Sequence, residues 1–358
     1  MSRNARLNAT ITTIICWLCC PLPPAVLAQT HSNGTALSAL GPRPRARVVI
    51  AEDAGATRAF KPDPARVRSL VNSALTNLTS QTSVAAAWRS LVSTQDIIGI
   101  KIFTSPSPGA GTRVPVVDAV VQGLLSARIP PDHIIIWDKH LADLRRAGYA
   151  TLASRHHVRL AGSADAGWDA KTFYENPLLG QLVYGDFEFK KEGEHLGRKS
   201  FVSKLVTQQL SKIINVTPLL NHNSAGVCGN LYSLAVGSVD NTLRFEGDPA
   251  RLAQAVPEIY ALPVLGDRVV LNVVDALLCQ YEGEQVGRLH YSSALNQVRV
   301  STDPVALDVL SIQELNVQRA LKGISSHSST NATDLYRNAS LVEIGISDPH
   351  QIQVETLK

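Results

Sequence analysis

The sequence predicts an α/β fold: a mostly parallel sheet with helices on both faces and an inserted β-rich segment. Short β-branched runs alternate with segments that carry apolar residues at helical spacing. The run IIIW at 134–137 is apolar throughout, as expected for a strand covered on both faces. An aromatic and glycine-containing stretch at 167–198 interrupts the alternation. No repeat of 20 to 50 residues is visible, so we expect a single domain over residues 47–358.

The elements follow from the same patterns, taken in chain order. β-branched and apolar runs predict strands at 48–51, 97–103, 133–137, 158–161, 212–216 and 268–274, with a last strand near 351–354. Helical spacing of apolar residues predicts helices at 64–78, 115–127 and 141–154. Phe187 and Phe189 alternate with polar residues, which predicts a hairpin inserted in the main sheet, over one of its ends. The stretch 325–333 is rich in Ser, Thr and Asn and is expected to be a loop.

The N-terminus has the pattern of a secretory signal peptide. Arg3 and Arg6 precede an apolar stretch at 9–20, and small residues at 25–28 predict cleavage after Ala28. The apolar stretch is shorter than the roughly 20 residues that a spanning helix needs, so no stable membrane span is expected. Residues 29–46 resemble a flexible lead-in. We therefore expect export to the periplasm or the extracellular space.

Charge and cysteine content exclude some classes of function. Loss of Arg3 and Arg6 would lower the net charge from +4 to +2, which argues against a nucleic-acid partner. Of the five cysteines, the exported chain would keep Cys228 and Cys279. One disulfide and two buried free thiols both remain open. A four-cysteine iron–sulfur cluster within the exported chain is excluded.

The segment 101–115 lies between a predicted strand and a predicted helix. A glycine-containing loop that enters a helix directs backbone amides and the positive end of the helix dipole toward an anion. Lys101 would add positive charge to that region. The loop residues that we expect to contact a ligand are Thr104, Gly109, Gly111 and Arg113. The spacing matches neither nucleotide-binding fingerprint, and a turn before a helix begun by Pro115 is an equal alternative.

Acidic residues follow several predicted strands. Asp138 comes directly after IIIW, where ligands gather in open parallel sheets, although a helix N-cap is the alternative. Asp275 comes directly after the strand at 268–274. Asp303 precedes Pro304, a pairing typical of a helix start, and Asp308 would face another side of that helix, where it could pair with Lys or Arg. Acids among apolar residues at strand ends indicate a polar site.

His222 follows the apolar run 213–220 in a loop that also holds Asn223 and Cys228. Imidazole and thiolate bind zinc, copper or iron, so a divalent metal on His222 and Cys228 is one interpretation. Asn223 is a candidate ligand-binding residue for a small molecule. The loop lacks paired metal-binding spacing, and a hydrogen-bonded structural histidine is the alternative.

An ordered set of motifs resembles the bacterial family called domain of unknown function 362. The matching pieces are 97–103 with Lys101, 116–127, IIIWD ending at 138, RAGY at 146–149, SFVSK at 200–204, IINVTPLLNHNSAGVCG at 213–229, GSVDN at 237–241, NVVDAL at 272–277, DPVALD at 303–308 and 340–357. The resemblance implies one α/β domain with a ligand or active site around the loop of His222. The chain departs from the family pattern at Asn221, at Cys228, and at Tyr232 with Ser233, where relatives often carry Lys, Thr and a Lys-Asn pair.

Two hypotheses follow for function. The first is an exported enzyme in which His222 acts as acid, base or ligand, Asp275 and Asp303 are carboxylate partners, and Lys101 stabilises charge. The second is a protein that binds a metal ion or small solute in the same pocket without turnover. Both require Lys101, His222 and an acid to meet in one pocket.

Overall fold

The computed structural model describes residues 45–105, 110–176, 181–184, 194–283, 286–324 and 330–358. In spatial order, its main sheet consists of β15 Ile352–Leu357, β1 Ala46–Glu52, β14 Ser292–Ser301, β13 Val269–Gln280, β11 Lys212–His222, β4 Ile98–Ile102, β5 Ile134–Asp138 and β6 Arg159–Gly162. β14 runs antiparallel to β1 and β13, and the other neighbouring strands in this order run parallel. A short strand, β12 (Gly226–Val227), pairs antiparallel with the end of β11. The predicted mostly parallel sheet is confirmed.

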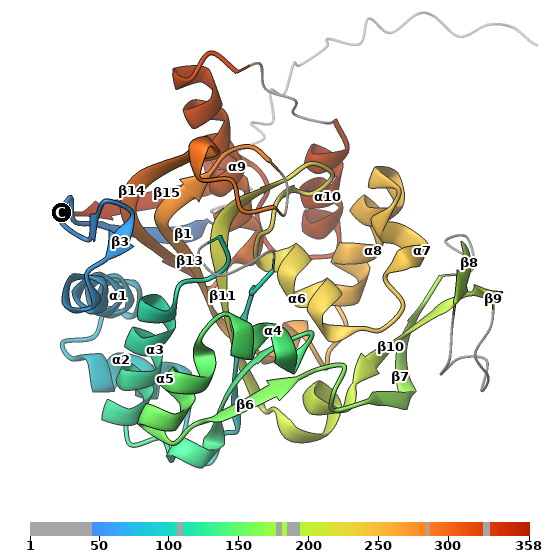
Figure 1. Cartoon of the computed structure of the whole chain (residues 1–358), viewed down its shortest axis with the longest axis horizontal. Coiled ribbons are helices and arrows are strands. Elements are labelled where there is room, and N and C mark those ends of the chain that lie inside the picture. The colour runs from blue at the N-terminus through green and yellow to red at the C-terminus, as the bar shows by residue number, and fades with distance from the viewer. Residues whose placement is uncertain (1–44, 106–109, 177–180, 185–193, 284–285, 325–329) are drawn as a thin grey trace, which may run out of the picture. The chain divides into compact units, whose positions relative to one another are not determined.

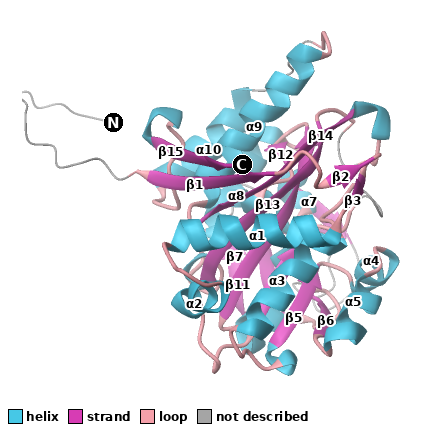
Figure 2. Ribbon diagram, turned by 90° about the vertical axis from the view of Figure 1, so that its left-hand side faces the viewer, coloured by secondary structure: helices cyan, strands magenta, loops and turns pink. Residues whose placement is uncertain are grey.

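Helices cover both faces of this sheet (Figures 1 and 2). The helices on one face are α1 Pro64–Thr79, α2 Val84–Leu91, α3 Val114–Ser126, α4 Leu141–Arg146 and α5 Tyr149–His156. The helices on the other face are α6 Asn230–Ser238, α7 Leu243–Glu246, α8 Pro249–Tyr260, α9 Pro304–Leu321 and α10 Thr330–Leu341. Each face has its own apolar core, which explains why the central strands are buried on both sides.

Local sequence explains several helix boundaries. α1, α8 and α9 each begin at the proline of an Asp-Pro pair, and in each the Asp side chain accepts a hydrogen bond from one or two backbone amides of the first turn. The predicted helix at 141–154 is instead two helices, α4 and α5. They separate at Gly148, which has a φ of +90°, a conformation that glycine adopts without strain.

The predicted strands are found, but two of them are longer than expected. β11 continues through Pro218 to His222, and β13 continues through Asp275 to Gln280. His222 is therefore the last residue of a strand, and Asp275 lies in the interior of one, so its expected position at a strand end is wrong. Both strands remain buried over these extensions, and a register shift after Pro218 and Asp275 accommodates them.

The inserted segment forms separate small sheets. β7 (Trp168–Glu175) pairs antiparallel with β10 (Lys199–Ser203), and β8 (Gln181–Tyr184) pairs with β9 (Glu194–Gly197). The described strands of the insertion pair with one another and not with the strands of the main sheet, and Val202 of β10 also forms an isolated antiparallel bridge with Val239. The hairpin expected from Phe187 and Phe189 stays a prediction. Phe187 and Phe189 lie outside the described residues.

The remaining elements are short. A small hairpin pairs β2 (Thr57–Arg58) with β3 (Lys61–Pro62). Single helical turns occupy Pro131–His133, Leu205–Gln209, Gly266–Arg268, Leu289–Tyr291 and Pro349–Gln351. The expected loop at 325–333 is wrong from Thr330, where α10 begins, and 325–329 lie outside the described residues.

The remaining sequence expectations concern the N-terminal segment, membrane spans and the two cysteines. The signal peptide at 1–28 and almost all of the lead-in at 29–46 lie outside the described residues, and β1 already begins at Ala46. Across the described ranges, no helix combines the length and apolar character that a bilayer crossing needs. Cys228 and Cys279 are both buried and both free thiols, so the disulfide alternative is wrong.

Candidate functional site

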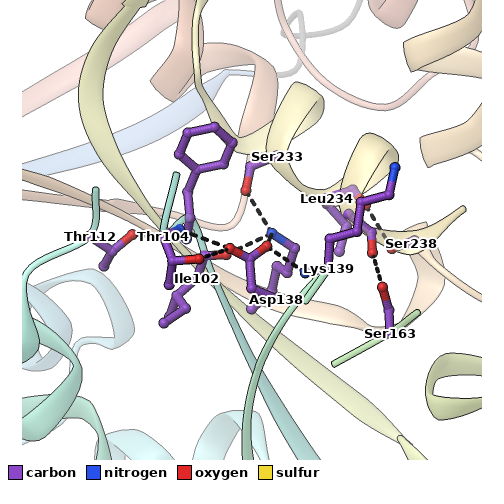
Figure 3. Close-up of polar contacts among 12 residues, drawn as sticks. Ile102, Thr104, Thr112, Asp138, Lys139, Ser163, Ser233, Leu234 and Ser238 are labelled. Carbon is purple, nitrogen blue, oxygen red and sulfur yellow. Dashed lines mark hydrogen bonds and ion pairs between the residues drawn. The ribbon is translucent and has the colours of Figure 1, made fainter. Parts of the chain in front are cut away.

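Asp138 of β5 and Ser233 of α6 point toward one another in a buried polar cluster (Figure 3), and Lys101 of β4 is hydrogen-bonded to both. The Lys101 side chain has no solvent exposure. Nζ donates to Asp138 Oδ1 at 2.9 Å, to Ser233 Oγ at 3.0 Å and to the Ile102 carbonyl at 2.7 Å. An ammonium has three protons, and all three are used here. Lys101 therefore has no donor left for a ligand.

Asp138 is equally saturated. Its Oδ1 accepts from Lys101 and from the backbone amide of Lys139, and its Oδ2 accepts from the amide and the hydroxyl of Thr104 at 2.8 and 2.6 Å. Burial raises the pKa of Asp138, but the Lys101 ammonium and the Thr104 hydrogen bonds outweigh it and hold the pKa below its ordinary value. Asp138 does not cap α4, so the N-cap alternative is wrong. The pair joins β4, β5 and α6 as a framework.

Gly237 allows α6 to approach the Lys101 side chain closely. A Cβ at this position would lie 2.3 Å from Lys101 Cε and 2.9 Å from Nζ. The Gly237 carbonyl also accepts from the Ser163 hydroxyl at 2.5 Å. The GSVDN motif therefore begins with the residue that packs on the ion pair.

Replacing Gly237 with alanine is expected to lower the free energy of unfolding by about 1–3 kcal/mol, because the added methyl overpacks a saturated ion pair. Urea denaturation followed by circular dichroism measures the effect. Gly247→Ala is the matched control, since nothing lies within 4 Å of its added Cβ. Equal stabilities of the two variants would contradict the close-approach argument.

Arg113 and Asp275 form a second buried ion pair, between the residue that precedes α3 and the interior of β13. Arg113 Nη1 lies 3.1 Å from Asp275 Oδ1, and the Arg113 amide donates to Oδ2 at 2.8 Å. The Asp275 side chain has no solvent exposure. This pair fixes the start of α3 on β13. Asp275 thus has a partner that sequence reasoning did not assign, and no described contact joins it to His222.

Asp303 and Asp308 support helices. Asp303 caps α9, accepting from the Ala306 amide, and its second oxygen accepts from the Ile346 amide; both distances are 2.9 Å. Asp308 accepts from the amides of Asn230 and Leu231 and from Asn230 Nδ2 at 2.7–3.0 Å, which caps α6. The expected pairing of Asp308 with Lys or Arg is wrong, because the helix α6 N-terminus supplies the donors. Among the described contacts neither acid meets His222.

His222 is half-buried at the end of β11, and its hydrogen bonds define its tautomer. The amides of Ser224 and Ala225 donate to its Nδ1 at 3.1 and 3.0 Å. Nδ1 is therefore an unprotonated acceptor, and the proton of the neutral ring is on Nε2. Burial lowers the pKa of His222 to about 4, against an opposing effect of Glu246. No described residue is within hydrogen-bond contact of Nε2, so at neutral pH the ring presents one N–H donor.

This tautomer bears on two expectations for His222, a general base and a metal ligand. A general base or a metal ligand needs a nitrogen lone pair directed at the substrate or ion. The lone pair of Nδ1 already accepts two backbone amides, and Nε2 carries the proton. Cys228 is fully buried, its Sγ lies 3.7 Å from the Asn221 carbonyl, and burial raises the pKa of its thiol. Within the described ranges no group of three or more His, Cys, Asp or Glu could hold a metal ion.

Tyr232 contacts the His222 ring, and the charge of Glu246 acts on both His222 and Lys139. Tyr232 on α6 packs on the ring with centroids 4.3 Å apart, and its hydroxyl donates to Glu246 Oε1 at 2.9 Å. Lys139 directly follows Asp138 and is half-buried, and its Nζ lies 3.4 Å from Thr242 Oγ1. Burial lowers the pKa of Lys139, while Glu246 and Asp240 oppose that shift. We call His222, Tyr232, Glu246 and Lys139 the α6–α7 edge site.

Other predicted ligand-binding residues have separate positions. Thr104 bonds Asp138, and Gly111 packs so tightly that a Cβ would lie 2.4 Å from the Phe103 carbonyl. Asn223 is exposed next to His222, and its Oδ1 accepts from Asn221 Nδ2 at 3.0 Å. Gly109 lies outside the described residues. The loop after β4 is thus tied to the ion pair through Thr104.

Sequence reasoning missed Tyr232, Ser233 and Glu246. Tyr232 and Ser233 are the two positions where the chain departs from the family pattern, and in the fold they contact His222 and Lys101. The departures from the family pattern at these two positions could have indicated that both residues contact the site. Glu246 had no such sequence signal, because its interactions with Tyr232, His222 and Lys139 arise only in the folded chain.

Of three comparisons with known proteins, the comparison with family models agrees with the motifs. No curated protein matches this chain. A crystal structure of a protein from Thermotoga maritima is similar at 10% sequence identity and a TM-score of 0.39, over 75% of this chain and 61% of that one. The chain therefore spans about three fifths of that protein's length. The family model described as Domain of unknown function (DUF362) matches residues 98–313, more than half of the sequence. This chain belongs to the DUF362 family.

Proposed function

We propose that this protein binds a small solute through the acceptor oxygens of a carboxylate or phosphate group at the α6–α7 edge site. The observation that carries the proposal is the His222 tautomer, which leaves Nε2–H as a donor without a described partner. A donor in this state binds an oxygen and not a metal ion. The Lys101–Asp138 pair does not contact the solute in this proposal; it holds α6, which carries Tyr232, through the Ser233 hydroxyl.

The neighbouring charges support an oxygen-bearing ligand. Lys139, whose nearest link to His222 is Glu246, adds a cation to the site, and its half-buried ammonium lies 3.4 Å from the Thr242 hydroxyl. Ion pairs in partly desolvated surroundings are stronger than in water. Glu246 balances the charge and accepts from Tyr232, which keeps the aromatic ring on His222. A neutral imidazole N–H can also polarise a carbonyl group. The same donor would therefore serve a binding protein, which releases the solute unchanged, or an enzyme, which converts it.

Titration with inorganic phosphate and with acetate tests the proposal. We expect the ¹⁵N and ¹H resonances of the His222 Nε2–H group to shift on addition of at least one of these anions. His222→Phe is expected to weaken binding of the active anion about tenfold or more, because a hydrogen bond to a charged group is lost. His290→Phe is the matched control at an exposed histidine. If neither anion moves the His222 resonances, an oxygen-binding site at His222 is refuted.

We further propose that the protein is exported and acts in the periplasm or outside the cell. The basic start, short apolar stretch and small residues at 25–28 support this proposal. Expression of the full chain in a bacterial host should give a processed protein whose N-terminal residue is Gln29. N-terminal sequencing of the periplasmic fraction checks this outcome. Recovery of the chain in the cytoplasm with residues 1–28 attached would contradict it.

A further inference from the structure

The loop that carries His222 is a short hairpin, residues 221–228, which we call the His222 hairpin. Asn221 pairs with Val227 and His222 with Gly226, and the Cys228 amide donates to the Leu220 carbonyl at 2.8 Å. Its turn supplies the two amides that face Nδ1. The position of those amides therefore decides which ring nitrogen carries the proton.

Tyr336, on α10, is hydrogen-bonded to the turn of this hairpin. Its hydroxyl donates to the Ala225 carbonyl at 2.9 Å, and the side chain is buried, with 3% exposure. The amide of the same Ala225 donates to His222 Nδ1. One residue thus connects Tyr336 to the imidazole, through a carbonyl on one side and an amide on the other.

Arg319, at the end of α9, holds the other end of the hairpin. Its guanidinium donates to Asn221 Oδ1, to Glu282 Oε1 at 2.9 Å and to Asn316 Oδ1 at 2.8 Å. The residue is 6% exposed. A planar guanidinium with three oriented acceptors cannot shift without breaking several hydrogen bonds. Asn221, the residue before His222, is therefore fixed from α9.

We propose that Tyr336 and Arg319 are positioning residues that hold the Ser224 and Ala225 amides on Nδ1 and so keep the proton of His222 on Nε2. Both residues lie beyond residue 313, where the family match ends, so this support comes from the C-terminal segment of the chain. The importance of this arrangement for solute binding rests on the proposed function. The tautomer itself can be measured without any ligand.

The test uses the full chain labelled with ¹⁵N-histidine and carrying Tyr336→Phe, which removes only the hydroxyl. Loss of one hydrogen bond is expected to raise the ratio of the Nδ1–H to the Nε2–H tautomer about fivefold, which corresponds to about 1 kcal/mol. The Nδ1 and Nε2 chemical shifts of His222 report this ratio. Tyr260→Phe is the matched control, because Tyr260 is equally buried but belongs to α8. Its His222 shifts are expected to equal those of the unmodified chain.

Arg319→Lys acts on the other end of the hairpin and serves as the second variant. Thermal unfolding shows which variants fold, and the tautomer ratio of each folded variant is then compared with the Tyr260→Phe control. Unchanged His222 shifts in the folded variants would overturn the positioning role. Failure of phosphate and acetate to bind the unmodified chain would refute the proposed function and leave the tautomer result intact.

Discussion

Replacing Lys101 with methionine is expected to lower the free energy of unfolding by about 3–5 kcal/mol, because removal of one partner leaves a buried charge unpaired. Asp138 would keep the Thr104 and Lys139 donors but lose the ammonium that holds its carboxylate charged. Ser233 and the Ile102 carbonyl would also lose their donor. Urea denaturation at neutral pH, followed by circular dichroism, measures the loss.

Lys204→Met is the matched control for this experiment. Lys204 is exposed, so its replacement should change stability by less than about 0.5 kcal/mol. The double variant Lys101→Met with Asp138→Leu removes both charges and is expected to lose less stability than Lys101→Met alone. A Lys101→Met protein as stable as the Lys204→Met protein would show that the ion pair does not hold β4, β5 and α6 together.

Asp308 is expected to make the protein less stable as the pH rises from about 4 to about 7. Burial raises the pKa of Asp308 from 3.8 to about 7, against the opposing hydrogen bonds from Leu231 and Asn230. Between these values the native state holds a proton that the unfolded chain releases, so stability falls with rising pH in this window and is constant with respect to Asp308 above it. A shift of about three pKa units corresponds to about 4 kcal/mol.

Asp308→Asn isolates this contribution. The amide does not titrate, so the difference in unfolding free energy between the unmodified chain and this variant should decrease as the pH rises through the window and then level off. Burial also raises the pKa of Asp303, and that contribution is present in both proteins. Stability measured by urea denaturation at several pH values from 4 to 8 checks the slope. A difference that stays constant, or grows with pH, contradicts a raised pKa.

Local pattern was sufficient for much of the fold. The buried run that became β5, the Asp-Pro starts of α1 and α9 and the apolar spacing of α3 depend on neighbouring residues, and each was found within a few residues of its prediction. The errors occur where pairing between segments far apart in the chain decides the bounds of an element. The extension of β13 past Asp275 depends on its pairing with β11 and β14, which no local property of the strand specifies.

The candidate site divides in the same way. Position after a buried strand drew attention to Asp138 and His222, and both are in polar surroundings. The sequence did not predict the roles of these residues, because the role of a polar side chain depends on which hydrogen-bond partners it already has in the folded protein. Lys101 and Asp138 satisfy one another, and Asp303 caps a helix and binds the Ile346 amide.

By itself, the sequence determined the α/β class, seven strands of the main sheet and the family to which the chain belongs, since these depend on residue periodicity and on ordered motifs. Only the tertiary structure decided which polar groups are already paired and which donor is left. That outcome depends on hydrogen bonds between residues far apart in the chain, such as Tyr336 with Ala225 and Lys101 with Ser233. The protonated nitrogen of His222 follows from contacts within its own hairpin, because the amides of Ser224 and Ala225 occupy the other nitrogen.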